Sequence, residues 1–173
     1  MYMRNLIIIT SFCLLQSLNL LAQNESEINQ KWVELKSHFK HKTELVTEFA
    51  SKLQKSKKID KKELEQTTFY AREFEKICEN KVLNKVLNKD IVGKVKQAND
   101  LLNTHLVRTL VNLESDFKLK MQESILSLYH QLTAVENQIL VAIKKYNEVC
   151  IKQNRKELIF EIHSEDRAAS IKF

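Results

Sequence analysis

The chain has 173 residues and a formal net charge of +6, and 43% of its residues are hydrophobic and 29% charged. This length and apolar content suffice for one domain with a core and exclude a disordered tail. There is one glycine, Gly93, and no proline. Because sheets turn on Gly, Asn and Pro and phosphate-binding loops need Gly, the composition predicts a few long helices and excludes a glycine-rich nucleotide-binding loop.

Residues 1–22 have the pattern of a signal peptide. Arg4 is the only charge, an apolar run follows from Leu6 to Leu15, and Ala22 precedes a suitable cleavage site. The alternative is an uncleaved membrane anchor, but a span needs about 20 mostly apolar residues. A large aromatic residue before Cys13 argues against a lipoprotein. We expect export to the periplasm or cell envelope, with membrane anchoring only if the segment is retained.

The rest of the chain is expected to form helices over residues 25–55, 61–89, 91–114 and 120–156. Asp60 and Asp90 are the predicted N-caps of the second and third helices. Short connections make successive helices antiparallel neighbours. The sequence therefore predicts an all-α fold, a long antiparallel four-helix bundle (up-down-up-down) over residues 24–157, followed by a C-terminal tail over 158–173. The alternative is a coiled coil with a partner chain.

The first and last helices carry the clearest apolar stripes. Their apolar positions are separated by alternating steps of three and four residues, the spacing of a coiled-coil seam. Lys42 is the one charged residue on these stripes. The two stripes consist of Ile28, Trp32, Leu35, Phe39, Lys42, Val46, Phe49 and Leu53, and of Ile125, Leu128, Leu132, Val135, Ile139, Ala142, Tyr146 and Val149.

Two further features concern partners and redox state. A basic cluster lies between the first two helices and is either a solvated loop or a contact patch for phosphate-bearing surfaces; its members are Lys52, Lys55, Lys57, Lys58, Lys61 and Lys62. No nucleic-acid partner is expected, because the aromatic residues lie on the helix stripes.

Cys78 and Cys150 fall on diagonal helices, farther apart than the ~7 Å between Cα atoms that a bridge allows, so we expect no disulfide.

No constellation typical of an enzyme or a metal site is present. His38 and His41 lie three apart on a lysine-rich helix face, which is more typical of a solvated surface than of a metal site. Di-iron bundles use Glu-x-x-His pairs, and no glutamate here has a histidine three residues later. No Cys or Ser has a recognisable catalytic partner. We expect no catalytic, cofactor-binding or metal-binding residues.

The last helix carries a pattern of apolar, acidic and amide residues that resembles the LemA family. The matching residues are Leu132, Glu136, Asn137, Ile139, Ala142, Tyr146, Asn147 and Asn154. Trp32 and its neighbours match the family's first helix in spacing, and the resemblance covers about residues 28–154. It implies an antiparallel helical bundle at the cell envelope with no established catalytic activity.

The chain departs from the family pattern in several places. Lys42 stands where the family usually has Arg, Thr47 where it has Pro, and Asp116-Phe117 where it has Tyr-Pro. Many members keep an uncleaved N-terminal membrane helix, whereas this N-terminus resembles a cleavable signal. The residues after Asn154 do not align with the family's C-terminus.

Polar motif residues suggest specific contacts in the helix bundle. A buried lysine is costly unless paired, so we expect Lys42 to pair with Glu136; the alternative is that its ammonium reaches solvent along the aliphatic stem. Asn137, Asn147 and Asn154 are expected to form hydrogen bonds between helices rather than to bind a ligand.

Three functions are compatible with these features. The first is a non-enzymatic envelope protein that acts by contact with another protein, the membrane surface or the cell wall, through its lysine-rich end or C-terminal tail. The second is a bundle that opens its core to a small ligand or lipid. The third is a hydrolase, which would require acids and histidines that converge in a pocket.

Overall fold

The computed structural model describes residues 2–80 and 87–161, and for residues 2–25 it describes the backbone only. No strand occurs in these ranges, and the predicted all-α class is confirmed. In the described part of the chain, five α-helices are followed by a short 3-10 helix. They are α1 (Tyr2–Leu53), α2 (Lys61–Glu79), α3 (Lys89–Glu114), α4 (Phe117–Lys120), α5 (Glu123–Lys152) and η1 (Lys156–Leu158).

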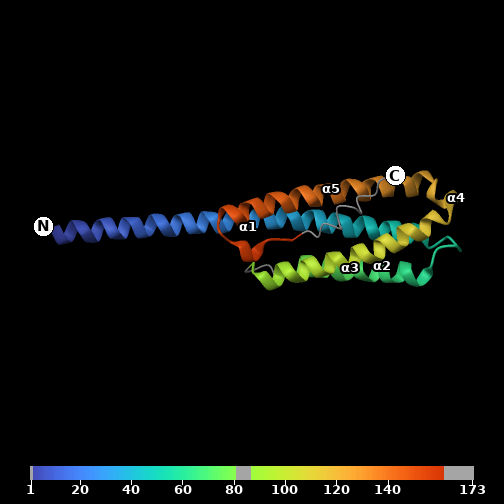
Figure 1. The fold of residues 1–173 in the computed structure, drawn as a ribbon, viewed down its shortest axis with the longest axis horizontal. Helices are drawn as coiled ribbons and strands as arrows, with labels where there is room; N and C mark the ends of the chain where they lie inside the picture. Colours follow the sequence, from blue (N-terminus) through green and yellow to red (C-terminus); the bar gives the residue numbers. More distant parts are fainter. Residues whose placement is uncertain (1, 81–86, 162–173) are drawn as a thin grey trace.

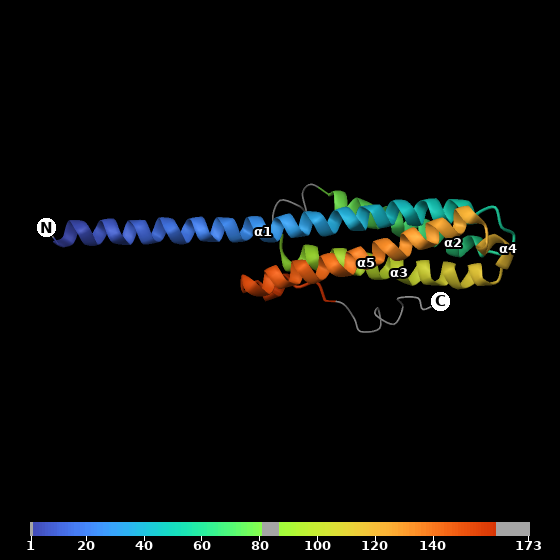
Figure 2. The ribbon, with the colours of Figure 1, turned by 90° about the horizontal axis from the view of Figure 1, so that it is seen from above.

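The four long helices run side by side and alternate in direction (Figure 1). α1 packs against both α2 and α5, and α2 packs against α3. The connection from α1 to α2 and the short α4 lie at the same end of the molecule (Figures 1 and 2). At the opposite end, the N-terminal part of α1 extends beyond the other helices.

The start of α1 differs from the sequence prediction. The first helix was expected to begin near residue 25, whereas α1 is continuous from Tyr2. No Gly or Pro interrupts residues 2–53, and the apolar leader consists largely of residues that helices tolerate, so nothing ends the helix at residue 25. Among the residues whose side chains the structure describes, 26–80 and 87–161, no helix has the length and hydropathy of a membrane span.

The boundaries of α2 and α3 also differ in part. Asp60 caps α2 as predicted, because its side chain accepts the Lys62 N–H at 2.9 Å. α2 ends at Glu79, before the predicted end at residue 89; residues 81–86 lie outside the described residues. Asn88, and not Asp90, caps α3, since its Oδ1 accepts the Ile91 N–H at 3.0 Å.

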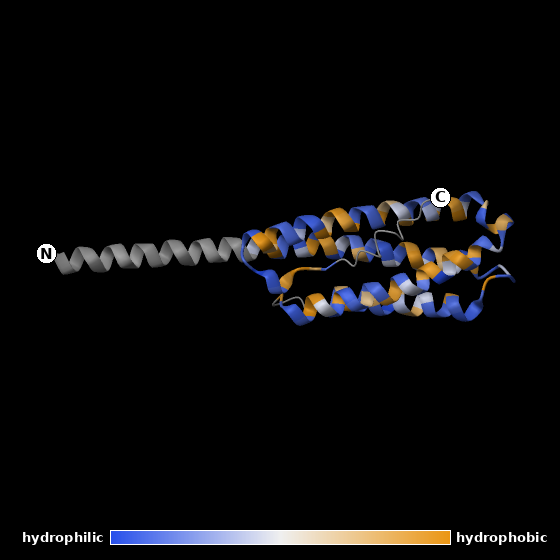
Figure 3. Cartoon of the chain, viewed as in Figure 1, coloured by the Kyte–Doolittle hydropathy of each residue, from blue (hydrophilic) through white to orange (hydrophobic). Residues whose placement is uncertain are grey.

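The core lies along the predicted stripes. Every member of the stripes on α1 and α5 is buried, including Lys42. Aromatic rings join the helices: Phe39 and Phe74 have centroids 5.0 Å apart, and Trp32 and Tyr146 have centroids 5.4 Å apart. Figure 3 shows hydrophobic positions recurring along each long helix between hydrophilic ones, as an amphipathic helix requires.

Candidate functional site

Lys42 is the centre of a buried polar network that joins three helices. Its side chain is 0% exposed. The ammonium of Lys42 on α1 donates to Asn99 Oδ1 on α3 at 3.0 Å and also to Asn103 Oδ1. It forms an ion pair with Glu136 Oε1 on α5 at 2.5 Å. The predicted Lys42–Glu136 pair is therefore present, and the alternative that the ammonium reaches solvent is wrong.

The network accounts for all three N–H donors of the lysine. An ammonium has three donors and no acceptor, and here three side-chain oxygens surround it. A buried charge is tolerated when it is paired and hydrogen-bonded in this way. The arrangement connects α1, α3 and α5, and it leaves the Lys42 nitrogen no open side for a substrate.

A second polar layer lies between α2 and α3. Glu63 Oε1 and His105 Nδ1 are 2.6 Å apart, and both residues are buried. The His105 ring stacks on Tyr70 with centroids 4.6 Å apart. The hydroxyls of Thr67 and Thr109 are hydrogen-bonded at 2.9 Å in the core. This acid–histidine pair faces inward from two packed helices, so it closes on itself instead of lining a pocket.

The motif residues at the end of α5 hold the C-terminal strap, which we define as residues 155–161. Tyr146 is fully buried and donates its hydroxyl to the Leu158 carbonyl at 2.9 Å. Asn147 donates to the Phe160 carbonyl at 2.9 Å and accepts the Phe160 N–H at 2.8 Å. Asn154 ends α5 with φ at 57°, a left-handed conformation that asparagine tolerates.

Two features of the strap differ from the sequence prediction. Leu158 and Phe160 are buried, and Phe160 contacts Phe39 with centroids 5.8 Å apart. Residues of the strap therefore pack on the helices, although the sequence analysis places 158–161 in the C-terminal tail; residues 162–173 lie outside the described residues. Asn147 and Asn154 shape the chain after α5, whereas hydrogen bonds between helices were expected. Asn137 is exposed, and no hydrogen bond within the described residues joins it to another helix.

The lysine-rich end, which we define as residues 51–62 and 114–123, is built around the connections from α1 to α2 and from α3 to α5. Asp116, the N-cap of α4, accepts the Ser56 hydroxyl at 2.9 Å and lies 3.9 Å from the Lys58 ammonium. These contacts bring Lys118 of α4 to the end of the molecule where the predicted cluster lies. The exposed lysines of this end are Lys55, Lys57, Lys58, Lys61, Lys62 and Lys118, and Lys52 is half-buried.

The cysteines lie at buried positions. Neither Cys78 nor Cys150 takes part in a disulfide within the described residues. Burial raises the pKa of the Cys78 thiol to about 12, and it also raises the pKa of the Cys150 thiol. Burial likewise raises the pKa of the Tyr146 hydroxyl, which lies beside Cys150. Both thiols stay protonated at neutral pH, where only the thiolate would be a nucleophile.

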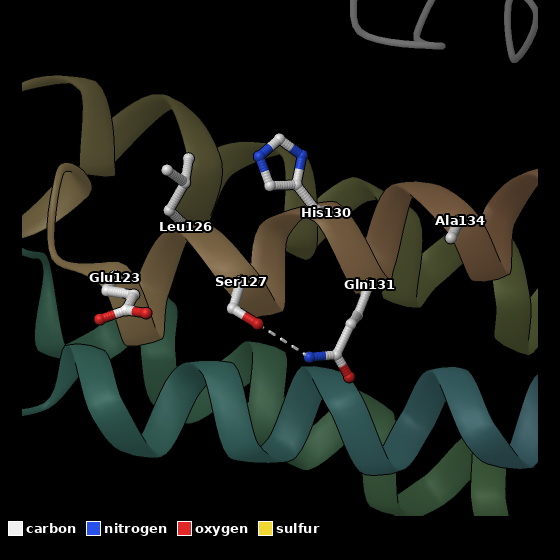
Figure 4. A pocket seen from close by; sticks show the side chains of 6 residues that line it. All are labelled: Glu123, Leu126, Ser127, His130, Gln131 and Ala134. Carbon is white, nitrogen blue, oxygen red and sulfur yellow. Dashed lines mark hydrogen bonds between the residues drawn. The ribbon is translucent and has the colours of Figure 1, made fainter.

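Two surface depressions lie on α5 or beside it. Figure 4 shows one whose six lining side chains all come from the outer face of α5, where Gln131 donates to Ser127 at 3.2 Å. Another lies between α1 and α5 and contains His38 and Asn137. His41 lies 3.7 Å from Glu44 on its own helix. Within the described residues, no three His, Cys, Asp or Glu side chains gather as metal ligands would.

These features define an all-α protein with long antiparallel helices and polar motif residues that bond to one another and to the strap. A model of the LemA family matches residues 31–164, which is most of the chain. The chain therefore belongs to the LemA family. The match includes the strap, which the sequence comparison above could not align. A search of curated proteins finds no significant match.

Proposed function

We propose that this LemA-family chain is an exported, non-enzymatic, up-down-up-down four-helix bundle that acts at the cell envelope by surface contact. The leader composition of residues 1–22 supports export. The alternating direction of α1, α2, α3 and α5 supports the bundle (Figure 1). In this proposal residues 1–22 are removed, and the folded part works as a rigid body whose outer surface meets its partner.

The Lys42 network is the observation that carries the proposal. It consists of an ammonium, a carboxylate and two amides, and the carboxylate and both amides contact the Lys42 ammonium. The Glu63–His105 pair is closed in the same way. Groups that could bind or transform a substrate are thus used to connect helices, which leaves recognition to the surface. The lysine-rich end supplies a surface with an excess of positive charge.

Photo-crosslinking from the natural compartment tests this proposal. A photoreactive residue is placed at Lys57, in the lysine-rich end, and separately at Lys144, on the exposed side of α5. We expect adducts in envelope fractions from position 57 and few from position 144. The intact mass of the same sample should correspond to a chain without residues 1–22. Recovery of an unprocessed chain in the cytosol, with no position-dependent adduct, would refute the proposal.

A second candidate is a small-ligand binder that opens at the strap end. One observation favours it: the indole Nε1 of Trp32 is buried without a hydrogen-bond partner within the described residues. A buried donor in this state is rare and could be satisfied by a ligand oxygen. Native mass spectrometry of the chain as purified would reveal a bound molecule, and Trp32→Phe, which removes the donor, should release it.

A further inference from the structure

The lysine-rich end carries two apolar side chains that face solvent. Phe117 is 69% exposed and Met121 is 54% exposed, and they lie at the start and just after the end of α4. Neighbouring apolar residues of the same two connections, Ile59 and Leu119, are buried. Apolar side chains can therefore be buried at this end, yet Phe117 and Met121 project outward from it.

The position of this apolar pair relative to the lysines is fixed by Asp116. Its carboxylate binds Ser56 and Lys58, both in the connection between α1 and α2. Ser56 also accepts the Lys58 N–H at 3.1 Å, which closes that connection into a tight turn. Phe117 follows Asp116 directly. Phe117 is thus joined through Asp116 to the same connection that carries the lysine cluster.

The charge of this end is strongly positive. Residues 51–62 and 114–123 contain eight lysines, four acids and no arginine, a net charge of +4. Two of the acids, Glu114 and Asp116, are already paired with lysines. Within the described part of the chain, no acidic side chain pairs with Lys55, Lys57, Lys62 or Lys118. Their charge is available to an external anion.

This combination matches the chemistry of an anionic membrane surface. Flexible lysines around protruding apolar side chains bind to anionic headgroups and place the apolar groups at the acyl boundary. Protein interfaces, in contrast, are depleted in lysine and enriched in arginine, and fixed phosphate sites favour the planar arginine fork. The lack of arginine at this end therefore favours lipid over a protein or a discrete phosphate ligand.

We propose that the lysine-rich end docks on anionic lipid bilayers, with Phe117 and Met121 entering the headgroup region. This inference rests on the proposed function and names the partner of its contact surface. The lysines supply long-range attraction that salt weakens, and the two apolar side chains supply a short-range contribution that salt does not weaken.

Vesicle binding tests the inference. The chain as purified is titrated with vesicles of phosphatidylcholine and with vesicles of an equal mixture of phosphatidylcholine and phosphatidylglycerol, at low and high salt. We expect binding to be at least about tenfold tighter to the anionic vesicles at low salt. The triple variant Lys55→Gln, Lys57→Gln, Lys62→Gln should lose about tenfold or more of this affinity. Its matched control changes three other exposed lysines, Lys94, Lys144 and Lys156, and should stay within about twofold.

The apolar contribution needs its own pair of variants. Phe117→Ser with Met121→Ser should weaken binding to anionic vesicles by about tenfold. Val33→Ser with Val141→Ser changes two exposed apolar side chains elsewhere and should have little effect. The fluorescence emission of a tryptophan introduced by Phe117→Trp should shift to the blue on vesicle binding, and brominated lipid should quench this fluorescence. All these positions are exposed, and circular dichroism checks that each variant is folded.

Several outcomes would overturn the inference. The first is binding to neutral vesicles as tight as binding to anionic vesicles. The second is a loss of affinity in the control variants as large as in the test variants. The third is competition by inorganic phosphate, which would indicate a discrete anion site. A failure here is distinguishable from a failure of the proposed function. Adducts at position 57 to a protein, without vesicle binding, would reject the lipid and keep the contact function. A cytosolic, unprocessed chain without adducts would reject the contact function itself.

Discussion

Asn147 holds the backbone of Phe160 with both ends of its amide. Nδ2 donates to the Phe160 carbonyl at 2.9 Å, and Oδ1 accepts the Phe160 N–H at 2.8 Å. The side chain thus does for an irregular segment what a neighbouring strand does in a sheet. These two bonds, with that from Tyr146 to Leu158, fix the strap against the helices and seat the Phe160 ring in the core.

Replacement of Asn147 should release the strap. Asn147→Ala leaves one donor and one acceptor of Phe160 without their partners, and we expect the free energy of unfolding to fall by about 1–3 kcal/mol. Hydrogen exchange at the Phe160 amide should accelerate more than at amides within α1. Asn137→Ala, an exposed asparagine on the same helix, is the control and should change stability by less than about 0.5 kcal/mol. Equal effects of the two variants would contradict this role.

The Lys42 network should depend on the charge of Glu136. Glu136→Gln keeps an acceptor but removes the negative partner of a buried ammonium. Because the Glu136 side chain is 36% exposed, solvent compensates in part, and we expect a loss of about 1–3 kcal/mol in urea unfolding. Glu44→Gln, which changes an exposed acid on α1, should cost less than about 0.5 kcal/mol. Unchanged stability of Glu136→Gln would mean that the ion pair contributes nothing.

Asn154 should tolerate glycine but not alanine. Its φ of 57° lies in the left-handed region, where a Cβ costs roughly 1–2 kcal/mol and glycine costs nothing sterically. The Arg155 N–H bonds to the Cys150 carbonyl at 2.8 Å and completes the helix end. We therefore expect Asn154→Ala to lower the unfolding free energy by about 1 kcal/mol, and Asn154→Gly to leave it unchanged or raise it slightly. The melting temperatures of the two variants provide the comparison.

Gly93 is a position where stability can be gained. It lies within α3, and a Cβ added there would meet no atom within 4 Å. Gly93→Ala should raise the free energy of unfolding by about 0.5–1 kcal/mol, because alanine loses less backbone entropy in a helix. The neighbouring exposed Lys94 offers the reverse test: Lys94→Gly should destabilise by a similar amount. A destabilising Gly93→Ala would mean that the helix is not regular there.

Alkaline pH should destabilise the chain. Burial raises the pKa of Cys78 from 9.0 to about 12, so between these pH values the folded chain keeps a proton that the unfolded chain loses. The free energy of unfolding therefore falls as pH rises from 9 towards 12, by up to roughly 1.4 kcal/mol per pH unit for one such group. Cys78→Ala should reduce this slope. Val149→Ala, a core truncation without a titrating group, should lower stability equally at every pH.

The helices and the core could be predicted from the sequence because they depend on local spacing. Every stripe position on α1 and α5 is buried, as the steps of three and four residues indicate. The Lys42–Glu136 pair was also predictable, since an uncompensated charge on an apolar stripe requires an opposite charge at a similar height on a neighbouring helix.

The polar layer and the strap could not be predicted in the same way. Glu63 and His105 are separated by 42 residues, and each alone is an ordinary helix residue whose partner depends on how α2 and α3 are placed. The only local signal was the position of Glu63 and Thr67 beside the apolar face of α2. The strap has no periodicity, so the burial of Phe160 against Phe39 could not be predicted from the spacing of apolar residues.

Coiled-coil seams tolerate sliding, because a shift of one helix by seven residues, about 10 Å, replaces each apolar contact with a similar one. The Lys42 network removes that freedom. The residues seven positions from Glu136 are Tyr129 and Ile143, and neither can neutralise the ammonium. The helices therefore have one permitted register, and the separation between the lysine-rich end and the strap is a fixed length of the molecule.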